Sequence, residues 1–197
     1  MAKLYFRYGA MNSGKSTALL QAAYNYEERD QHVLLAKPAI DSKGGGSIVS
    51  RLGVTREADF TIAPGERMRE AFLRERASAE QPVACLLVDE AQFLGEEQVD
   101  DLLRIAVLDG VPVLAYGIRT DFRTRAFPGS RRLLEVAHSL EELKTICRCG
   151  RKAVFNARRL GDRYVFDGGQ VAIDGVEVAY ESLCAQCYLR ESGGVLA

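Results

Sequence analysis

The chain has 197 residues, of which 47% are hydrophobic and 27% are charged, and its formal net charge is -1. This length can bury one substantial core and carry one small additional lobe. The near-zero net charge argues against attraction of the whole surface to nucleic acid or to an anionic membrane, so we expect neither as a partner. We find no signal peptide and no apolar run as long as a bilayer span, and we therefore expect a cytoplasmic protein.

The first expected strand, 3–8, runs into a phosphate-binding loop of the pattern G-x-x-x-x-G-K-[S/T], and a helix is expected at 16–26. Strand, glycine-rich turn and helix are the context that this motif requires. Its glycines allow backbone N–H groups to point at phosphate oxygens. Lys15 is expected to reach the β- and γ-phosphates of ATP, and Ser16 to bind Mg²⁺. The residues predicted to hold the nucleotide are Gly9, Ala10, Met11, Asn12, Ser13, Gly14, Lys15, Ser16 and Thr17.

A second motif is an apolar run at 83–88 that ends in two acids. We expect this run to form a strand beside the strand of the phosphate-binding loop, so that Asp89 holds the Mg²⁺ through a bound water. Glu90, one residue further on, is the candidate general base that polarises a hydroxyl or a water for attack on the γ-phosphate. Cys85 lies within the run and is expected to be a small buried apolar residue.

Apolar runs alternate with amphipathic segments along the first two thirds of the chain. The expected strands are 3–8, 32–37, 83–88 and 111–116, and the expected helices are 16–26, 65–76, 96–107 and 131–137. This alternation predicts an α/β fold, a RecA-like P-loop domain with a mostly parallel sheet flanked by helices. The glycine-rich stretch 41–47 suits either a mobile loop near the phosphates or an ordinary surface loop.

The segment 117–132 contains five arginines and a single acid, Asp121. It follows the end of an expected strand, and open α/β sheets bind ligands at that edge. We favour a segment that contacts phosphate and supplies phenylalanine side walls for an acceptor substrate; the alternative is an exposed loop.

Four cysteines occur in two close pairs, and short strand-like runs at 164–166 and 171–173 separate them. The pairs are Cys147 with Cys149 and Cys184 with Cys187. Four thiolates complete a tetrahedral shell, so the pattern predicts a zinc ribbon with a structural Zn²⁺. The alternative, two disulfides, is disfavoured in a cytoplasmic chain. We therefore expect a P-loop domain at 1–143 and a small zinc-binding lobe at 144–197.

Taken together, these residues resemble the type II thymidine kinases, small P-loop deoxynucleoside kinases with a zinc-bearing lasso lobe. The segments 9–17, 37–41, 89–93 and 116–123 occur in the order found in that family, and the paired cysteines follow them. The resemblance implies transfer of the γ-phosphoryl group of ATP to the 5′-hydroxyl of thymidine, giving dTMP, in the salvage of deoxynucleosides for DNA synthesis. It also implies a homotetramer that is inhibited by the end product dTTP.

The resemblance assigns roles to single residues as well. Glu90 matches the catalytic base of the family, and Gln92 of the same motif joins the nucleotide-binding residues. Asp41 matches the acid of an Asp-x-Arg loop near the phosphates and metal. Lys43 replaces the arginine of that loop, which leaves a point charge in place of a bidentate phosphate contact. Arg159 matches a basic position for which we assign no role.

The positions that match the thymidine pocket are Met11, Phe93, Ile118, Phe122, Phe127, Ala172 and Tyr180. Preference for thymidine or deoxyuridine depends on the room that Met11 and Tyr180 leave around the 5-position of the base.

Two other functions fit parts of the sequence. A RecA-like, nucleic-acid-stimulated ATPase would use Glu90 to activate water and the arginines to contact a phosphodiester backbone. The short chain and its near-zero net charge argue against that function. A zinc-ribbon binding module with a vestigial nucleotide site is disfavoured because Lys15, Ser16, Asp89 and Glu90 are all intact.

Overall fold

The structure is a computed structural model of the chain. It describes residues 1–40, 46–170 and 178–196. The features predicted above that lie outside the described residues are Asp41, Lys43, Ala172, the strand-like run 171–173 and residues 41–45 of the glycine-rich stretch.

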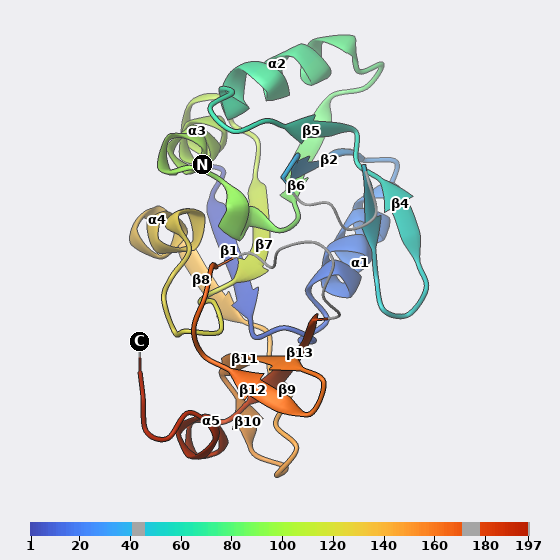
Figure 1. The fold of residues 1–197 in the computed structure, drawn as a ribbon. Helices are drawn as coiled ribbons and strands as arrows, with labels where there is room; N and C mark the ends of the chain where they lie inside the picture. Colours follow the sequence, from blue (N-terminus) through green and yellow to red (C-terminus); the bar gives the residue numbers. More distant parts are fainter. Residues whose placement is uncertain (41–45, 171–177, 197) are drawn as a thin grey trace.

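A six-stranded sheet forms the centre of the larger part of the described chain (Figure 1). Its strands lie in the order β5-β2-β6-β7-β1-β8, and each pair of neighbours is parallel. The strands are β1 (Leu4–Gly9), β2 (His32–Pro38), β5 (Phe60–Ile62), β6 (Val83–Val88), β7 (Val113–Ile118) and β8 (Ser139–Glu142). The predicted α/β fold with a mostly parallel sheet is confirmed.

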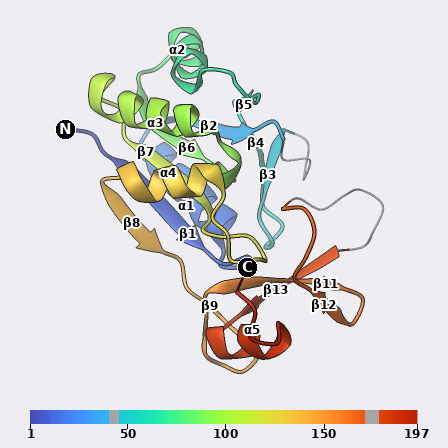
Figure 2. The ribbon, with the colours of Figure 1, turned by 60° about the vertical axis from the view of Figure 1, so that its left-hand side comes forward.

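Helices cover both faces of this sheet (Figure 1 and Figure 2). They are α1 (Lys15–Glu27) on one face and α2 (Met68–Ser78), α3 (Glu96–Leu108) and α4 (Pro128–Val136) on the other. In β2, Leu35 belongs to one apolar cluster with Leu19 of α1, whereas Leu34 belongs to another with Phe72 of α2. Because both faces are buried, the strands appear in the sequence as continuous apolar runs. Within the described residues, no helix is both long and apolar enough to cross a membrane.

One expectation about the order of the strands is wrong. We expect the strand that ends before Asp89 to lie beside the strand of the phosphate-binding loop, but β7 lies between β6 and β1. A crossover connection can pass over a neighbouring position in the sheet, and nothing in the local sequence fixes where the strand is inserted. The carboxyl ends of β1, β7 and β6 nevertheless lie along one edge of the sheet.

Several short elements have no counterpart among the expected ones. The edge strands β5 and β8 are two of them, and β3 (Ser47–Val49) and β4 (Thr55–Glu57) form a separate antiparallel hairpin. A 3-10 turn, η1 (Ala91–Phe93), follows β6. Elements of three or four residues are too short to show a hydrophobic period. The helix expected at 65–76 begins three residues later than expected, at Met68.

The last part of the described chain forms a small lobe against one end of the sheet (Figure 1 and Figure 2). Its elements are β9 (Thr145–Ile146), β10 (Lys152–Ala153), β11 (Phe155–Leu160), β12 (Arg163–Val165), β13 (Val178–Leu183) and α5 (Ala185–Glu191). β11 pairs antiparallel with both β12 and β13. The lobe has an apolar cluster of its own, which includes Ala157 and Leu183. The division into domains 1–143 and 144–197 stays a prediction.

At Gly129, α4 packs tightly against the backbone in and after η1. A Cβ atom at this position would lie 2.5 Å from the carbonyl oxygen of Ala91 and 2.7 Å from that of Leu94. Both are backbone atoms, so relief requires the helix to move. We expect Gly129→Ala to lower the free energy of unfolding by about 1–3 kcal/mol, as overpacking does. Urea denaturation measures this as a lower midpoint.

Gly46→Ala is the matched control, because no heavy atom is found within 4 Å of a Cβ added at Gly46. Its effect should stay within about 0.5 kcal/mol. Equal effects of the two substitutions would mean that α4 can shift freely, contrary to this packing.

Candidate active site

The phosphate-binding loop connects β1 to α1 at the carboxyl edge of the sheet (Figure 1). Gly14 has a φ of 75°, which is the left-handed region that favours glycine. At Gly9, a Cβ would lie 2.5 Å from the carbonyl oxygen of Leu143, so only glycine fits there. The first turn of α1 has no side-chain cap and no acidic residue. Its free N–H groups and positive dipole end therefore form an anion site.

Lys15, the first residue of α1, lies between this loop and two carboxylates. Its Nζ donates a hydrogen bond to the Ala10 carbonyl oxygen over 2.9 Å. Burial lowers the pKa of Lys15, while the charges of Glu90 and Asp89 act in the opposite direction. The two motifs recognised in the sequence thus lie within electrostatic reach of each other.

Ser16 and Asp89 form the direct contact between the motifs. Ser16 Oγ donates a hydrogen bond to Asp89 Oδ2 over 3.2 Å, although the residues are 73 positions apart. Asp89 is buried, and burial together with the adjacent charge of Glu90 raises the pKa of its carboxyl group. A hydroxyl and a carboxylate at a site for polyphosphate are oxygen ligands, which suit a hard cation such as Mg²⁺. The donor set therefore fits the metal that the resemblance implies.

Glu90 adopts an unusual backbone conformation, with φ 48° and ψ 37°. The left-handed region is uncommon for a residue other than glycine, and it is found at functional sites where the surroundings hold it in place. Gln92 stabilises Glu90, since Gln92 Nε2 donates a hydrogen bond to Glu90 Oε2. Its Oε1 accepts a hydrogen bond from the Ile118 N–H at the end of β7, over 3.2 Å. Gln92 is buried, and both ends of its amide are bonded within the protein.

The aromatic residues predicted to contact thymidine form two groups. Phe93 and Phe127 pack edge to face, with ring centroids 5.5 Å apart. Phe122 and Tyr180 share a partner, because the Arg158 guanidinium lies 3.7 Å from the centroid of the Phe122 ring and donates from Nε to Tyr180 Oη over 3.2 Å. Cation–π contact and hydrogen bond together fix these two rings from the lobe side.

Arg158 is not among the residues predicted from the sequence, which name its neighbour Arg159 as a basic position without a role. Residues of a strand alternate between its faces, so only one of two adjacent arginines can point to the site. Arg158 pairs across the strands with Tyr180, one of the predicted pocket residues, and the sequence alone does not reveal that register.

The five arginines of the segment 117–132 differ in whether they form ion pairs. Arg131 forms an ion pair with Glu96, and Arg132 forms one with Asp100 over 2.7 Å, so both arginines hold α4 to α3. Arg123 forms an ion pair with Asp121, in which Arg123 Nε lies 3.5 Å from Asp121 Oδ2. Within the described part of the chain, Arg119 and Arg125 make no ion pair. Of these two, Arg119 directly follows β7 at the carboxyl edge of the sheet.

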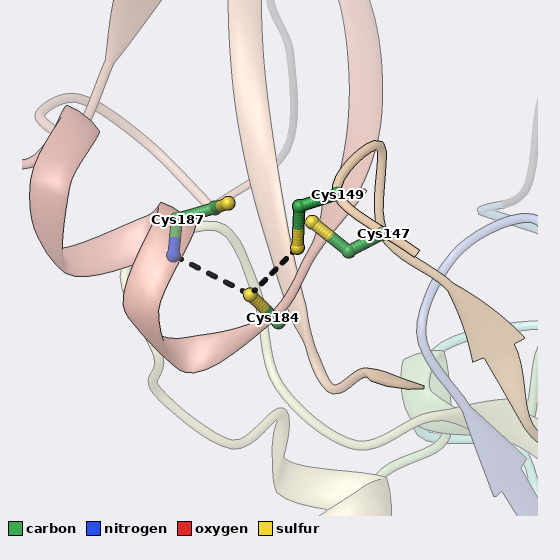
Figure 3. Close-up of side chains that lie close together, drawn as sticks. All are labelled: Cys147, Cys149, Cys184 and Cys187. Carbon is green, nitrogen blue, oxygen red and sulfur yellow. Dashed lines mark hydrogen bonds between the residues drawn. The ribbon is translucent and has the colours of Figure 1, made fainter. Parts of the chain in front are cut away.

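The four paired cysteines converge in the lobe (Figure 3). Their Sγ atoms all lie within 4.8 Å of one another, and all four thiols are free. Cys149 Sγ lies 3.6 Å from Cys184 Sγ, close to the roughly 3.8 Å between thiolates on one tetrahedral Zn²⁺. The Cys187 N–H, 3.5 Å from Cys184 Sγ, lowers the pKa of that thiol and favours the thiolate. The cluster fits Zn²⁺, and the two disulfides considered above do not form.

Cys85 lies apart from this cluster, as expected. It is buried in β6, where burial raises the pKa of the thiol to about 12. A thiol with so high a pKa is a poor nucleophile, so the prediction of a small buried apolar residue is confirmed.

Comparison with known proteins agrees with this geometry. A family model described as thymidine kinase matches residues 2–188. The thymidine kinases of Idiomarina loihiensis and Ruegeria pomeroyi are each 49% identical to the chain over 98% of its length, and the matches cover 99% and 96% of those relatives. The thymidine kinase of Chromobacterium violaceum is 47% identical over 95% of the chain and 98% of its own length.

A solved structure of Bacteroides Pif1 bound to ssDNA covers 72% of this chain and 38% of that one, with a TM-score of 0.38 and 18% identity, which is too remote to carry an argument. The family model and the relatives instead match nearly the whole chain, at close to half of its positions. The chain belongs to the thymidine kinase family.

Proposed function

We propose that the chain transfers the γ-phosphoryl group of ATP to the 5′-hydroxyl of thymidine, giving dTMP and ADP. The observation that carries the proposal is the hydrogen bond between Ser16 and Asp89, with Glu90 next to Asp89 in the chain. This contact lies at the carboxyl edge of the sheet, where the phosphate-binding loop leads into α1. Membership of the thymidine kinase family supports the choice of nucleoside.

Each residue of the phosphate side has a separate task. N–H groups of the loop and Lys15 bind the phosphates and neutralise their charge. Ser16 and Asp89 hold Mg²⁺, which when bound neutralises the charge that develops on the phosphates. Glu90 accepts the proton of the 5′-hydroxyl while the oxygen of that hydroxyl bonds to the γ-phosphorus. The bond between the γ-phosphorus and the bridging oxygen breaks, and ADP leaves with that oxygen. Gln92 keeps the carboxylate of Glu90 oriented.

On the acceptor side, aromatic rings bind the base. Phe93 and Tyr180 are half-buried, so their planar rings can offer apolar surface to a thymine base. Phe122 and Phe127 are buried, and Phe127 packs against Phe93. Walls of this kind also exclude water, which would compete with the nucleoside as the acceptor. By resemblance, Met11, Ile118 and Ala172 complete the pocket, and Asp41 lies near the phosphates.

We also propose a homotetramer that is inhibited by dTTP and acts in the cytoplasm, as the resemblance implies. The cysteine cluster in this proposal is a structural Zn²⁺ site. Four thiolates leave no open position for substrate, so the metal supports the lobe and takes no part in the chemistry.

A phosphoryl-transfer assay over a panel of nucleosides tests the function directly. With ATP and Mg²⁺, we expect labelled phosphate on thymidine and little on purine nucleosides, because the family that the chain belongs to is named for thymidine. Parallel reactions contain DNA in place of nucleoside. Release of phosphate that depends on DNA and ignores thymidine would instead support a nucleic-acid-stimulated ATPase.

Glu90→Gln tests the general base. The amide oxygen of glutamine can still accept from Gln92 Nε2, so the local structure should persist. We expect turnover to fall by about 10²-fold or more while the affinities for ATP and thymidine stay close to wild type. Glu80→Gln, a change of the same kind at an exposed site, is the control. Turnover of Glu90→Gln near that of the control would remove Glu90 from the mechanism.

Removal of the metal tests the zinc site. We expect about one Zn²⁺ per chain, and we expect Cys184→Ser to lose it and to lower the melting temperature, because the lobe has only a small core. Elemental analysis and thermal denaturation measure the two effects. Cys85→Ala changes a buried cysteine outside the cluster and should keep its zinc. Retention of zinc by Cys184→Ser, or zinc loss with an unchanged melting curve, would contradict a structural site.

A further inference from the structure

Asn156 of the lobe touches two loops of the main part at once. Its Oδ1 accepts a hydrogen bond from the Met11 N–H in the phosphate-binding loop over 2.7 Å. Its Nδ2 donates to the Thr120 carbonyl oxygen over 2.8 Å, in the loop that follows β7. We call residues 119–127 the acceptor loop. Asn156 is only 2% exposed, so it connects the two loops from a buried position.

Ser182 makes a second hydrogen bond from the lobe to the phosphate-binding loop. It is the cross-strand partner of Asn156 in the pairing of β11 with β13, and its Oγ donates to the Met11 carbonyl oxygen. The N–H and C=O groups of Met11 are therefore both bound by one pair of lobe residues. Two bonds of opposite polarity at one residue fix the orientation of both adjoining peptide groups.

Tyr188 makes a second contact with the acceptor loop. It lies in α5, next to Cys187, and its hydroxyl donates to the Phe122 carbonyl oxygen over 2.7 Å. Tyr188 is buried. The backbone of the acceptor loop is thus held by the lobe at two points, Thr120 and Phe122.

The strand geometry of the lobe explains why these contacts occur together. Side chains alternate along a strand, so Asn156 and Arg158 share one face of β11, and their partners Ser182 and Tyr180 share the same face of β13. This face is directed at the two loops. Ala157, between the first two, belongs to the apolar cluster of the lobe.

We propose that Asn156, Ser182 and Tyr188 are positioning residues that fix the phosphate-binding loop relative to the acceptor loop, so that the lobe sets the separation of the two substrates. The proposal rests on the proposed function, because it takes ATP at the first loop and thymidine at the second. In-line transfer depends steeply on this separation, and a displacement of about 1 Å can cost about 10²-fold in rate.

The contacts divide by loop, which makes the proposal testable with three substitutions. Ser182→Ala removes a contact with the phosphate-binding loop alone, and we expect KM for ATP to rise about 3- to 10-fold. KM for thymidine should rise less, because the contact is made by the backbone of Met11 and the resemblance places only the side chain of Met11 in the thymidine pocket. Tyr188→Phe removes a contact with the acceptor loop alone, and we expect the reverse. Asn156→Leu removes contacts with both loops, and we expect both KM values to rise and kcat to fall by about 10-fold or more.

Matched controls separate positioning from general loss of stability. Ser78→Ala and Tyr24→Phe remove hydroxyl groups from exposed residues and should leave kinetics unchanged. Ser182→Thr keeps a hydroxyl and should restore most of the ATP affinity lost in Ser182→Ala. Zinc content and melting temperature are measured for every variant. If Asn156→Leu does not fold, the two hydroxyl deletions still carry the test.

Three outcomes would overturn the proposal. Lower melting temperatures with wild-type KM and kcat values would mean that the contacts only attach the lobe. If Ser182→Ala and Tyr188→Phe changed the KM values for ATP and for thymidine equally, each contact would not act on the substrate of its own loop. Calorimetric titration with ATP alone separates this proposal from the proposed function: unaltered ATP affinity in Ser182→Ala refutes the positioning role even if thymidine is not the acceptor.

Discussion

The hydrogen bond between Ser16 and Asp89 depends on the parallel arrangement of the central sheet. Strands that run in the same direction bring all of their carboxyl ends to one edge, so residues that directly follow different strands meet there. Ser16 lies in the first turn of α1, which the phosphate-binding loop connects to β1, and Asp89 directly follows β6. β7 lies between these strands and contributes the Ile118 N–H to the same edge. The positions of the phosphate-binding loop, of the candidate Mg²⁺ ligands and of the candidate base therefore all follow from one topology.

The strained conformation of Glu90 has a clear local support. A left-handed backbone at a residue with a Cβ costs about 1–3 kcal/mol, and such a cost persists only where the surroundings stabilise it. Here the buried amide of Gln92 connects the Glu90 carboxylate to the end of β7. The adjacent Gly117 leaves room for that amide, since a Cβ there would lie 2.8 Å from Gln92 Oε1. Through Gln92, the end of β7 thereby keeps the Glu90 carboxylate in one orientation.

Much of the fold and site could be predicted because the signals are local. The phosphate-binding loop, the acids after β6 and the paired cysteines each occupy a few consecutive positions with fixed chemistry. The position of β7 between β6 and β1 could not be predicted, because any strand order satisfies the same apolar runs. The role of Asn156 could not be predicted either, since its partner Met11 is 145 residues away and the contact exists only after the lobe has docked. Asp41 and Ala172 remain predictions from the resemblance.

The alternating face of β11 and β13 also limits how this chain can change in length. A shift of one residue in the pairing would replace Asn156 by Ala157 at the contact with Met11 and would turn Arg158 away from Tyr180. Insertions within 155–160 are therefore incompatible with the site, even though they lie in a peripheral lobe. The turn at Gly161, where φ is positive, can absorb extra residues without altering that register. Tolerance to insertion and deletion in the lobe is thus set by strand register rather than by distance from the phosphates.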